Sequence, residues 1–233
     1  MTIVIVSDVH FEMGYFHGNY EYGALEWLIS VITRVKPIAL IGLGDWGSAW
    51  KGKDWEAVTR LVPVHAIYGN HDNMQFLQSA RNIDGTPVLL EDGEVRIIDG
   101  FRFGFINGIM AERVERLKEV PRKTQLDFLS FGKNLVGVDV LCTHESPSVP
   151  NLDRRLHASL GSNTMSDVLE LARPRMSFSG HVGRGCIVST IGSTLSVIID
   201  SSQLSKNFVL LEVASKELSI WKDTVLVERI SFA

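Results

Sequence analysis

The chain has 233 residues, 45% of them hydrophobic, which suits one globular domain over residues 1–233 with a sizeable buried core. Its 23 basic and 27 acidic side chains give a formal charge of −4, so no overall positive field favours nucleic acid or an anionic membrane. The apolar opening before Asp8 lacks the basic flank and length of a signal peptide, and no apolar run approaches the roughly 18 residues that span a bilayer. Cys142 and Cys186 lie in apolar, strand-like segments, which favours reduced thiols over a disulfide. We therefore expect a cytoplasmic protein without membrane attachment.

Short apolar runs alternate with helical patterns along most of the chain. Runs of this kind, rich in β-branched residues, are typical of strands in a sheet that is covered on both faces. There are five: Ile3–Val6, Ile38–Ile41, Val64–Tyr68, Val138–Cys142 and Met176–Phe178. Apolar residues at helical spacing predict helices between them, at Tyr22–Val35, Thr124–Leu135 and Ser166–Ala172. This order of elements predicts an α/β fold.

Two regions depart from this alternation. Pro87–Asn107 is typical of consecutive strands separated by two Asp-Gly turns, and Cys186–Phe232 is typical of a strand-rich tail. These strands need a sheet to join. We therefore predict a four-layer α-β-β-α sandwich, in which two mixed β-sheets pack together and helices flank them.

Each of the five apolar runs is followed by residues that commonly bind metals. These are Asp8 and His10, Asp45, Asn70-His71-Asp72, His144 and His181. In open α/β sheets ligands bind beyond the carboxyl ends of the strands, so we expect these side chains to meet at one rim. Carboxylate and amide oxygens with imidazole nitrogens suit divalent manganese, iron, zinc or nickel better than calcium or copper. Because residues i and i+2 of an extended segment share a face, Asp8 and His10 are expected to grip one ion, while Asp45 has two oxygens with which to bridge two.

The order of these motifs resembles the calcineurin-like metallophosphoesterase superfamily. The matching motifs are Asp8-Val-His10, Gly44-Asp45, Gly69-Asn70-His71-Asp72, Thr143-His144 and Gly180-His181. Between the motifs, Gly108, the stretch Val138–Pro147 and Gly161-Ser162 before a predicted helix resemble its smaller prokaryotic phosphoesterases. An Asp-x-His or a Gly-Asp pair occurs by chance in many chains, whereas Gly-Asn-His-Asp is much rarer, although Asn70 and Asp72 could be turn residues at a strand end. Five motifs in order, each after a predicted strand, make a shared metal site the better interpretation.

This resemblance implies a hydrolase that cleaves a phosphate mono- or diester, as a phosphatase or phosphodiesterase, through a metal-activated hydroxide. It implies two divalent metal ions, manganese being one candidate, and a phosphorylated small molecule or nucleotide as substrate, while a nucleic acid substrate is possible but unsupported by the net charge. His71 is left to protonate the leaving oxygen, and Asp72 either orients the His71 ring or caps the segment that follows. The resemblance assigns six metal ligands: Asp8 and His10 to the first ion, Asp45 to both ions, and Asn70, His144 and His181 to the second.

One departure from the superfamily pattern concerns the first metal. The last motif usually ends Gly-His-x-His, and Gly183 stands where the second His is expected. Water, His17, Glu12 or His157 are the candidates to fill this position, and no spacing decides between them. Weaker binding of the first ion is therefore expected. The alternative interpretation of the chain is a degenerate phosphoesterase fold that binds metal or a partner without efficient catalysis, against which the retained His71 argues.

Other noticeable residues are left out of the predicted site. His65 lies within a predicted strand and is expected to be a sheet residue whose ring is hydrogen-bonded, not a ligand. Trp46, Trp50 and Trp55 follow Asp45 closely and could stack on a nucleobase, although such clusters more often pack in a core or a lid.

Overall fold

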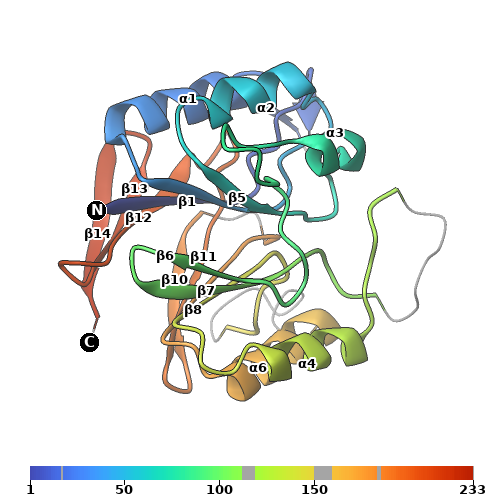
Figure 1. The fold of residues 1–233 in the computed structure, drawn as a ribbon, viewed down its shortest axis with the longest axis vertical. Helices are drawn as coiled ribbons and strands as arrows, with labels where there is room; N and C mark the ends of the chain where they lie inside the picture. Colours follow the sequence, from blue (N-terminus) through green and yellow to red (C-terminus); the bar gives the residue numbers. More distant parts are fainter. Residues whose placement is uncertain (17, 112–118, 150–158, 183–184, 233) are drawn as a thin grey trace.

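The structure, a computed structural model, describes residues 1–16, 18–111, 119–149, 159–182 and 185–232, which form two six-stranded sheets packed face to face (Figure 1). The first sheet has the order β14-β13-β12-β1-β4-β5, with β1 (Thr2–Val6), β4 (Ala39–Leu43), β5 (Val64–Ile67), β12 (Asn207–Glu212), β13 (Glu217–Lys222) and β14 (Val225–Ser231). The second has the order β10-β11-β9-β8-β7-β6, with β6 (Val95–Ile98), β7 (Phe101–Ile106), β8 (Val140–Thr143), β9 (Met176–Ser179), β10 (Ile187–Ile191) and β11 (Thr194–Ile198). A small hairpin joins β2 (Tyr15–Phe16) to β3 (Asn19–Tyr20).

Helices cover the outer face of each sheet, which confirms the predicted four-layer sandwich (Figure 1). The first sheet carries α1 (Ala24–Val35), α2 (Gly52–Thr59) and α3 (Met74–Ser79), and the second carries α4 (Gln125–Asn134) and α6 (Leu160–Ala172). Within the described residues, no helix has both the length and the apolar character needed to cross a bilayer.

Alternation of side chains along the strands divides the interior into three cores. In β1, Ile3 and Ile5 contribute to the core between the two sheets, whereas Val4 and Val6 contribute to the core beneath the helices of the first sheet. This is the period of two expected of a strand that is buried on both faces. A third core, which includes Phe128, packs α4 and α6 against the second sheet.

The three tryptophans after Asp45 belong to the core beneath the helices. Trp46, Trp50 and Trp55 are each at most 2% exposed, and their rings lie 4.3 to 5.5 Å apart between centroids. The Trp46 indole N–H donates to the carbonyl of Ile67 at 3.2 Å, and the Trp50 indole N–H donates to the carbonyl of Trp46 at 2.6 Å. Core packing, the favoured interpretation, is confirmed.

The five predicted apolar runs form β1, β4, β5, β8 and β9, but they do not share one sheet. The first three pair in parallel in the first sheet, whereas β8 and β9 pair in parallel in the second. The tail is integrated into both sheets, because β12 pairs with β1 and β11 pairs with β9. The rim that receives the site residues is therefore built from the strand ends of two packed sheets.

Several local features differ from the sequence prediction. The last predicted helix begins at Leu160 instead of Ser166, because the Ser159 side chain caps it by accepting the backbone N–H of Ser162 at 3.0 Å. The short elements β2, β3, α2 and α3 were not predicted. Cys142 is buried and Cys186 half-buried, and both are free thiols, as expected.

His65 gives this fold a calculable response to acid. It lies half-buried in β5, outside the candidate site, and burial together with the positive charge of Arg96 lowers its pKa. The unfolded chain, with a pKa of about 6.5, therefore binds the proton more tightly, and stability is lost as pH falls through that value. We expect His65→Gln to lose less stability than the wild type between about pH 7.5 and 5.5, measured by urea unfolding. Equal losses in the two proteins would contradict this assignment.

Candidate metal centre

Four of the six predicted ligands have a left-handed backbone. Asp8, His10, Asp45 and His181 have φ values of 55°, 48°, 53° and 70°. Such conformations cost a non-glycine residue roughly 1–3 kcal/mol and cluster at functional sites. The expectation that Asp8 and His10 share a face of an extended segment is wrong, because β1 ends at Val6 and both residues are left-handed. Sharp turns after the strands bring these side chains to the rim.

Asp8, His10 and Asp45 form the first group of potential ligands, whose ligand atoms all lie within 4.8 Å of one another. His10 Nε2 is 3.7 Å from Asp8 Oδ1 and 3.8 Å from Asp45 Oδ2. The Asp8 carboxylate is held in place because it accepts the Ser7 hydroxyl at 2.7 Å and the backbone N–H of His181 at 3.0 Å.

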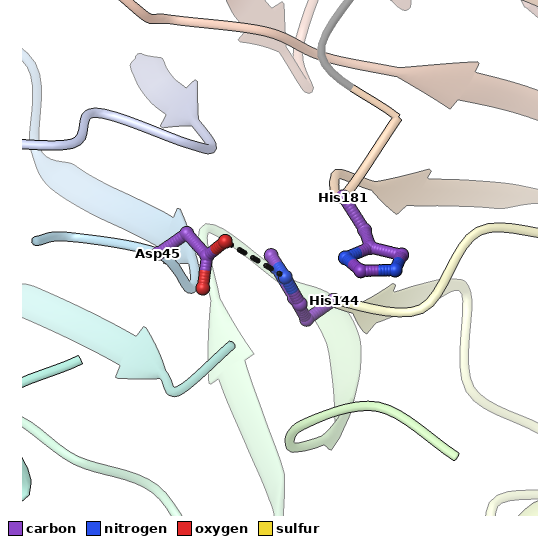
Figure 2. Close-up of side chains that lie close together, drawn as sticks. All are labelled: Asp45, His144 and His181. Atoms are coloured by element: carbon purple, nitrogen blue, oxygen red, sulfur yellow. Dashed lines mark ion pairs between the residues drawn. The ribbon is translucent and has the colours of Figure 1, made fainter. Parts of the chain in front are cut away.

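Asp45, His144 and His181 form the second group (Figure 2), again within 4.8 Å. His144 Nε2 is 3.5 Å from Asp45 Oδ2, and its Nδ1 is 2.8 Å from the carbonyl oxygen of Leu43. That carbonyl can only accept, so Nδ1 carries the proton and Nε2 faces the site, as in many metal-binding histidines.

Asp45 joins the two groups through one oxygen. Its Oδ1 accepts the backbone N–H groups of Asn70 at 2.6 Å and His71 at 2.8 Å. Its Oδ2 is left facing the rings of both His10 and His144. The geometry of a bridging carboxylate is therefore present in the folded chain.

Two buried polar atoms fit a bound cation. Asn70 Oδ1 and His144 Nε2 have no hydrogen-bond partner among the described residues, although buried polar atoms are rarely left unpaired. Both are lone-pair donors, and with the surrounding carboxylates they form an oxygen and nitrogen set that suits a divalent transition metal. These residues therefore fit the metal site that the sequence predicts.

Opposing charges dominate the electrostatics of the centre. Burial alone would raise the pKa of Asp45, but the imidazoles of His144, His10 and His71 outweigh it and hold that pKa well below its usual range. Burial alone would lower the pKa of His144, but Asp45 and Asp8 outweigh it and raise that pKa to about 10. Asp45 and His144 by themselves thus form a carboxylate–imidazolium pair, and a metal ion that binds His144 must displace a proton.

His71 and Asp72 lie beside the ligand groups and have different surroundings. The half-buried His71 ring is 5.8 Å from the His10 ring and 5.0 Å from the Phe16 ring, between centroids. The buried Asp72 carboxylate accepts the backbone N–H groups of Gly69 at 2.6 Å, Asp45 at 3.1 Å and Trp46 at 2.6 Å. These bonds tie the loop after β4 to the loop after β5, whereas the two roles expected for Asp72, orienting the His71 ring or capping the segment that follows, stay predictions. A direct catalytic role for either residue stays a prediction.

The comparison with protein families shows which superfamily the chain belongs to. The sequence model of the calcineurin-like phosphoesterase superfamily domain matches residues 1–181, which include every predicted ligand. The chain belongs to this superfamily. A comparison with the sequences of curated proteins gives no match.

Solved structures share the calcineurin-like phosphoesterase fold with this chain at low sequence identity. The protein TT1561 of Thermus thermophilus has a TM-score of 0.68 and 14% identity, over 95% of this chain and 98% of its own. A dimetal phosphatase from Danio rerio has a TM-score of 0.66 and 12% identity, over 100% and 99%. GAP50, the anchor in the inner membrane complex of Plasmodium, has a TM-score of 0.60 and 11% identity, over 100% and 88%. The fold is thus shared by a phosphatase and an anchor.

Of the residues at or proposed for the position of the superfamily's usual second histidine, the structure describes only Glu12. Gly183, His17 and His157 lie outside the described residues. Glu12 is described, and its carboxylate accepts both the backbone N–H and the hydroxyl of Ser48. Neither ligand group of the described chain includes Glu12.

Supporting residues at the centre were missed from the sequence. The hydroxyl of Ser7 fixes Asp8, and the carbonyl of Leu43 fixes His144. Ser7 could have been found, since it directly precedes the first motif. A backbone carbonyl has no residue-type signal, so Leu43 could not.

Gly69 makes room for the centre and provides a test of it. A Cβ atom at Gly69 would overlap the Asp45 carboxylate and the His144 ring, whereas a Cβ at Gly52 would meet nothing within 4 Å. We expect Gly69→Ala to weaken manganese binding at least about 10-fold, the low end of losses from disturbed ligand positioning. Titration calorimetry measures this, with Gly52→Ala as the matched control. Undiminished affinity in Gly69→Ala would refute the assigned centre.

Proposed function

We propose that this calcineurin-like phosphoesterase hydrolyses a phosphate mono- or diester with two divalent metal ions, manganese, iron, zinc or nickel. The observation that carries this proposal is Asp45 Oδ2, which faces His10 on one side and His144 on the other. Asp8, His10 and Asp45 would hold one ion. Asp45, Asn70, His144 and His181 would hold the second.

When bound, such a pair of ions would polarise the phosphate oxygens and lower the pKa of a water molecule towards neutrality. The protein itself positions the metal ligands through hydrogen bonds to its backbone. Asp45 is fixed by two backbone N–H groups and His144 by the Leu43 carbonyl, so the ligand set is organised before substrate arrives.

His71 is proposed as the general acid. Its ring lies next to the first ligand group, 5.8 Å from the His10 ring, but belongs to neither group. From this position it can give a proton to the leaving oxygen as the bond from that oxygen to phosphorus breaks. Asp72 supports it indirectly, because its carboxylate holds the loop that presents Asn70 and His71.

The substrate is proposed to be a phosphorylated small molecule or a nucleotide, acted on in the cytoplasm. The formal charge of −4 offers no general attraction for nucleic acid, and two free thiols suit a reducing compartment.

Hydrolysis of two esters with different leaving groups tests the function. A poor alkoxide leaving group needs protonation more than 4-nitrophenolate does. With manganese bound, we expect His71→Ala to lower kcat by roughly 10²- to 10⁴-fold for an alkyl phosphate ester and by less for the 4-nitrophenyl ester. Elemental analysis should still find two metal equivalents per chain in this variant.

Asp45→Ala is the companion variant, expected to lose both metal binding and turnover. An equal effect of His71→Ala on the two esters would argue against a general acid. If the wild type binds metal but turns over neither ester with any of the four metals, the degenerate, non-catalytic alternative is favoured.

A further inference from the structure

A groove of about 410 Å³ opens beside His71. It is lined by residues of four segments of the chain, among them Phe16 of β2, Asn70, His71, Glu119, Val120 and Arg122. The Phe16 ring also lies 4.5 Å from the His10 ring, between centroids, so the groove begins where the first ligand group ends. The groove is therefore contiguous with the metal centre.

The position of the general acid indicates which part of the substrate this groove holds. If His71 gives a proton to the leaving oxygen, the leaving group must lie on the His71 side of the phosphorus atom. A separate cavity of about 230 Å³, bordered by His181 and Glu145, lies next to the second ligand group instead. The groove that contains His71 is thus the place for the leaving group.

A buried neighbour holds Arg122 at the groove. The ammonium group of Lys123 donates to the Tyr68 hydroxyl and to the carbonyl of Asn107, both at 2.7 Å, and lies 3.1 Å from Asp92 Oδ2. The backbone of Lys123 also forms a bridge with Met110. Because neighbouring residues of an extended segment point to opposite sides, the inward Lys123 directs Arg122 outward, into the groove.

Among the described residues that line this groove, Arg122 is the one arginine or lysine. It is half-buried and makes no hydrogen bond or ion pair with any residue in the described part of the chain. Three acids share the groove with it, and one of them, the buried Asp72, already accepts the backbone N–H groups of Gly69, Asp45 and Trp46. The carboxylate of Glu12 is already bonded to Ser48, and Glu119 is exposed to solvent, where its charge is screened.

We propose that Arg122 determines specificity by binding an anionic substituent, a carboxylate or a second phosphate, on the leaving group of the substrate. The guanidinium presents a planar fork of donors that matches the paired oxygens of such groups. The Phe16 ring forms a wall of the same groove and suits a planar leaving group. This inference rests on the proposed phosphoesterase function and specifies what it acts on.

Two matched esters separate leaving-group binding from general effects on catalysis. Phenyl phosphate and 4-carboxyphenyl phosphate differ only in one carboxylate, which belongs to the leaving group. We expect Arg122→Gln to lower kcat/KM for the carboxylated ester about 10-fold or more relative to its effect on phenyl phosphate, as for a lost charge-assisted hydrogen bond. Dividing the variant's rate by the wild-type rate for each ester cancels their different intrinsic reactivities.

Arg229→Gln, on the edge strand β14 of the first sheet, is the control and should leave kcat/KM unchanged for both esters. Equal losses on both esters would show that Arg122 contacts the transferred phosphate, and no loss on either would show that the groove does not hold the leaving group. Either result overturns the proposal.

Binding of the same two esters to the manganese-loaded protein gives a readout that does not need turnover. If the wild type hydrolyses neither ester, the proposed function fails, while calorimetry still tests Arg122. A selective loss of affinity for 4-carboxyphenyl phosphate in Arg122→Gln supports the proposal, and parallel affinities contradict it.

Discussion

The carboxylate of Asp45 is the interaction on which the candidate site depends. Its Oδ1 accepts two backbone N–H groups from the loop after β5, and its Oδ2 faces histidines from the loops after β1 and β8. One side chain therefore fixes the relative positions of loops from both sheets. Because the carboxylate is 2% exposed, these bonds form in a region where water competes weakly.

Hydrogen bonds between the surrounding loops hold this carboxylate in position. The Asp72 carboxylate accepts the backbone N–H groups of Asp45 and Gly69. It therefore links the loop that contains Asp45 to the loop that contains Gly69. The polar contacts of Lys123 join Tyr68, at the end of β5, to Asn107, at the end of β7. The two sheets are thus pinned together by polar groups at the rim, and by apolar side chains elsewhere between them.

Much of this arrangement could be predicted from the sequence, because it follows from local patterns. The apolar runs predicted all five strands that carry site residues, and the motifs after them predicted the residues that the structure gathers into two groups sharing Asp45. The division of these strands between two sheets was not predicted, since parallel pairing partners leave no mark in a single sequence. The left-handed turns at Asp8 and His10 were also missed, because glycine is the strong signal for such conformations, and aspartate and histidine adopt them only in a minority of positions.

Residues that act through tertiary position were the hardest to find. Arg122 is far from His71 in the sequence, and no motif surrounds it. Its place at the groove follows from the burial of Lys123, and that burial depends on contacts with Tyr68, Asp92 and Asn107 from other parts of the chain. Periodicity within one segment contains no information of this kind.

The charges at this rim also explain why it suits a divalent cation better than a neutral ligand. Asp8 and Asp45 are each 2% exposed, and within the described chain only histidines form ion pairs with them. Buried carboxylates are costly unless a positive charge lies nearby, and left-handed backbone at the same residues adds to that cost. A cation that binds the folded chain, and not the unfolded one, offsets both costs in proportion to its concentration. The features that make this rim unfavourable by itself are therefore the ones that give it affinity for metal, and the three apolar cores supply the stability that allows such a rim to form.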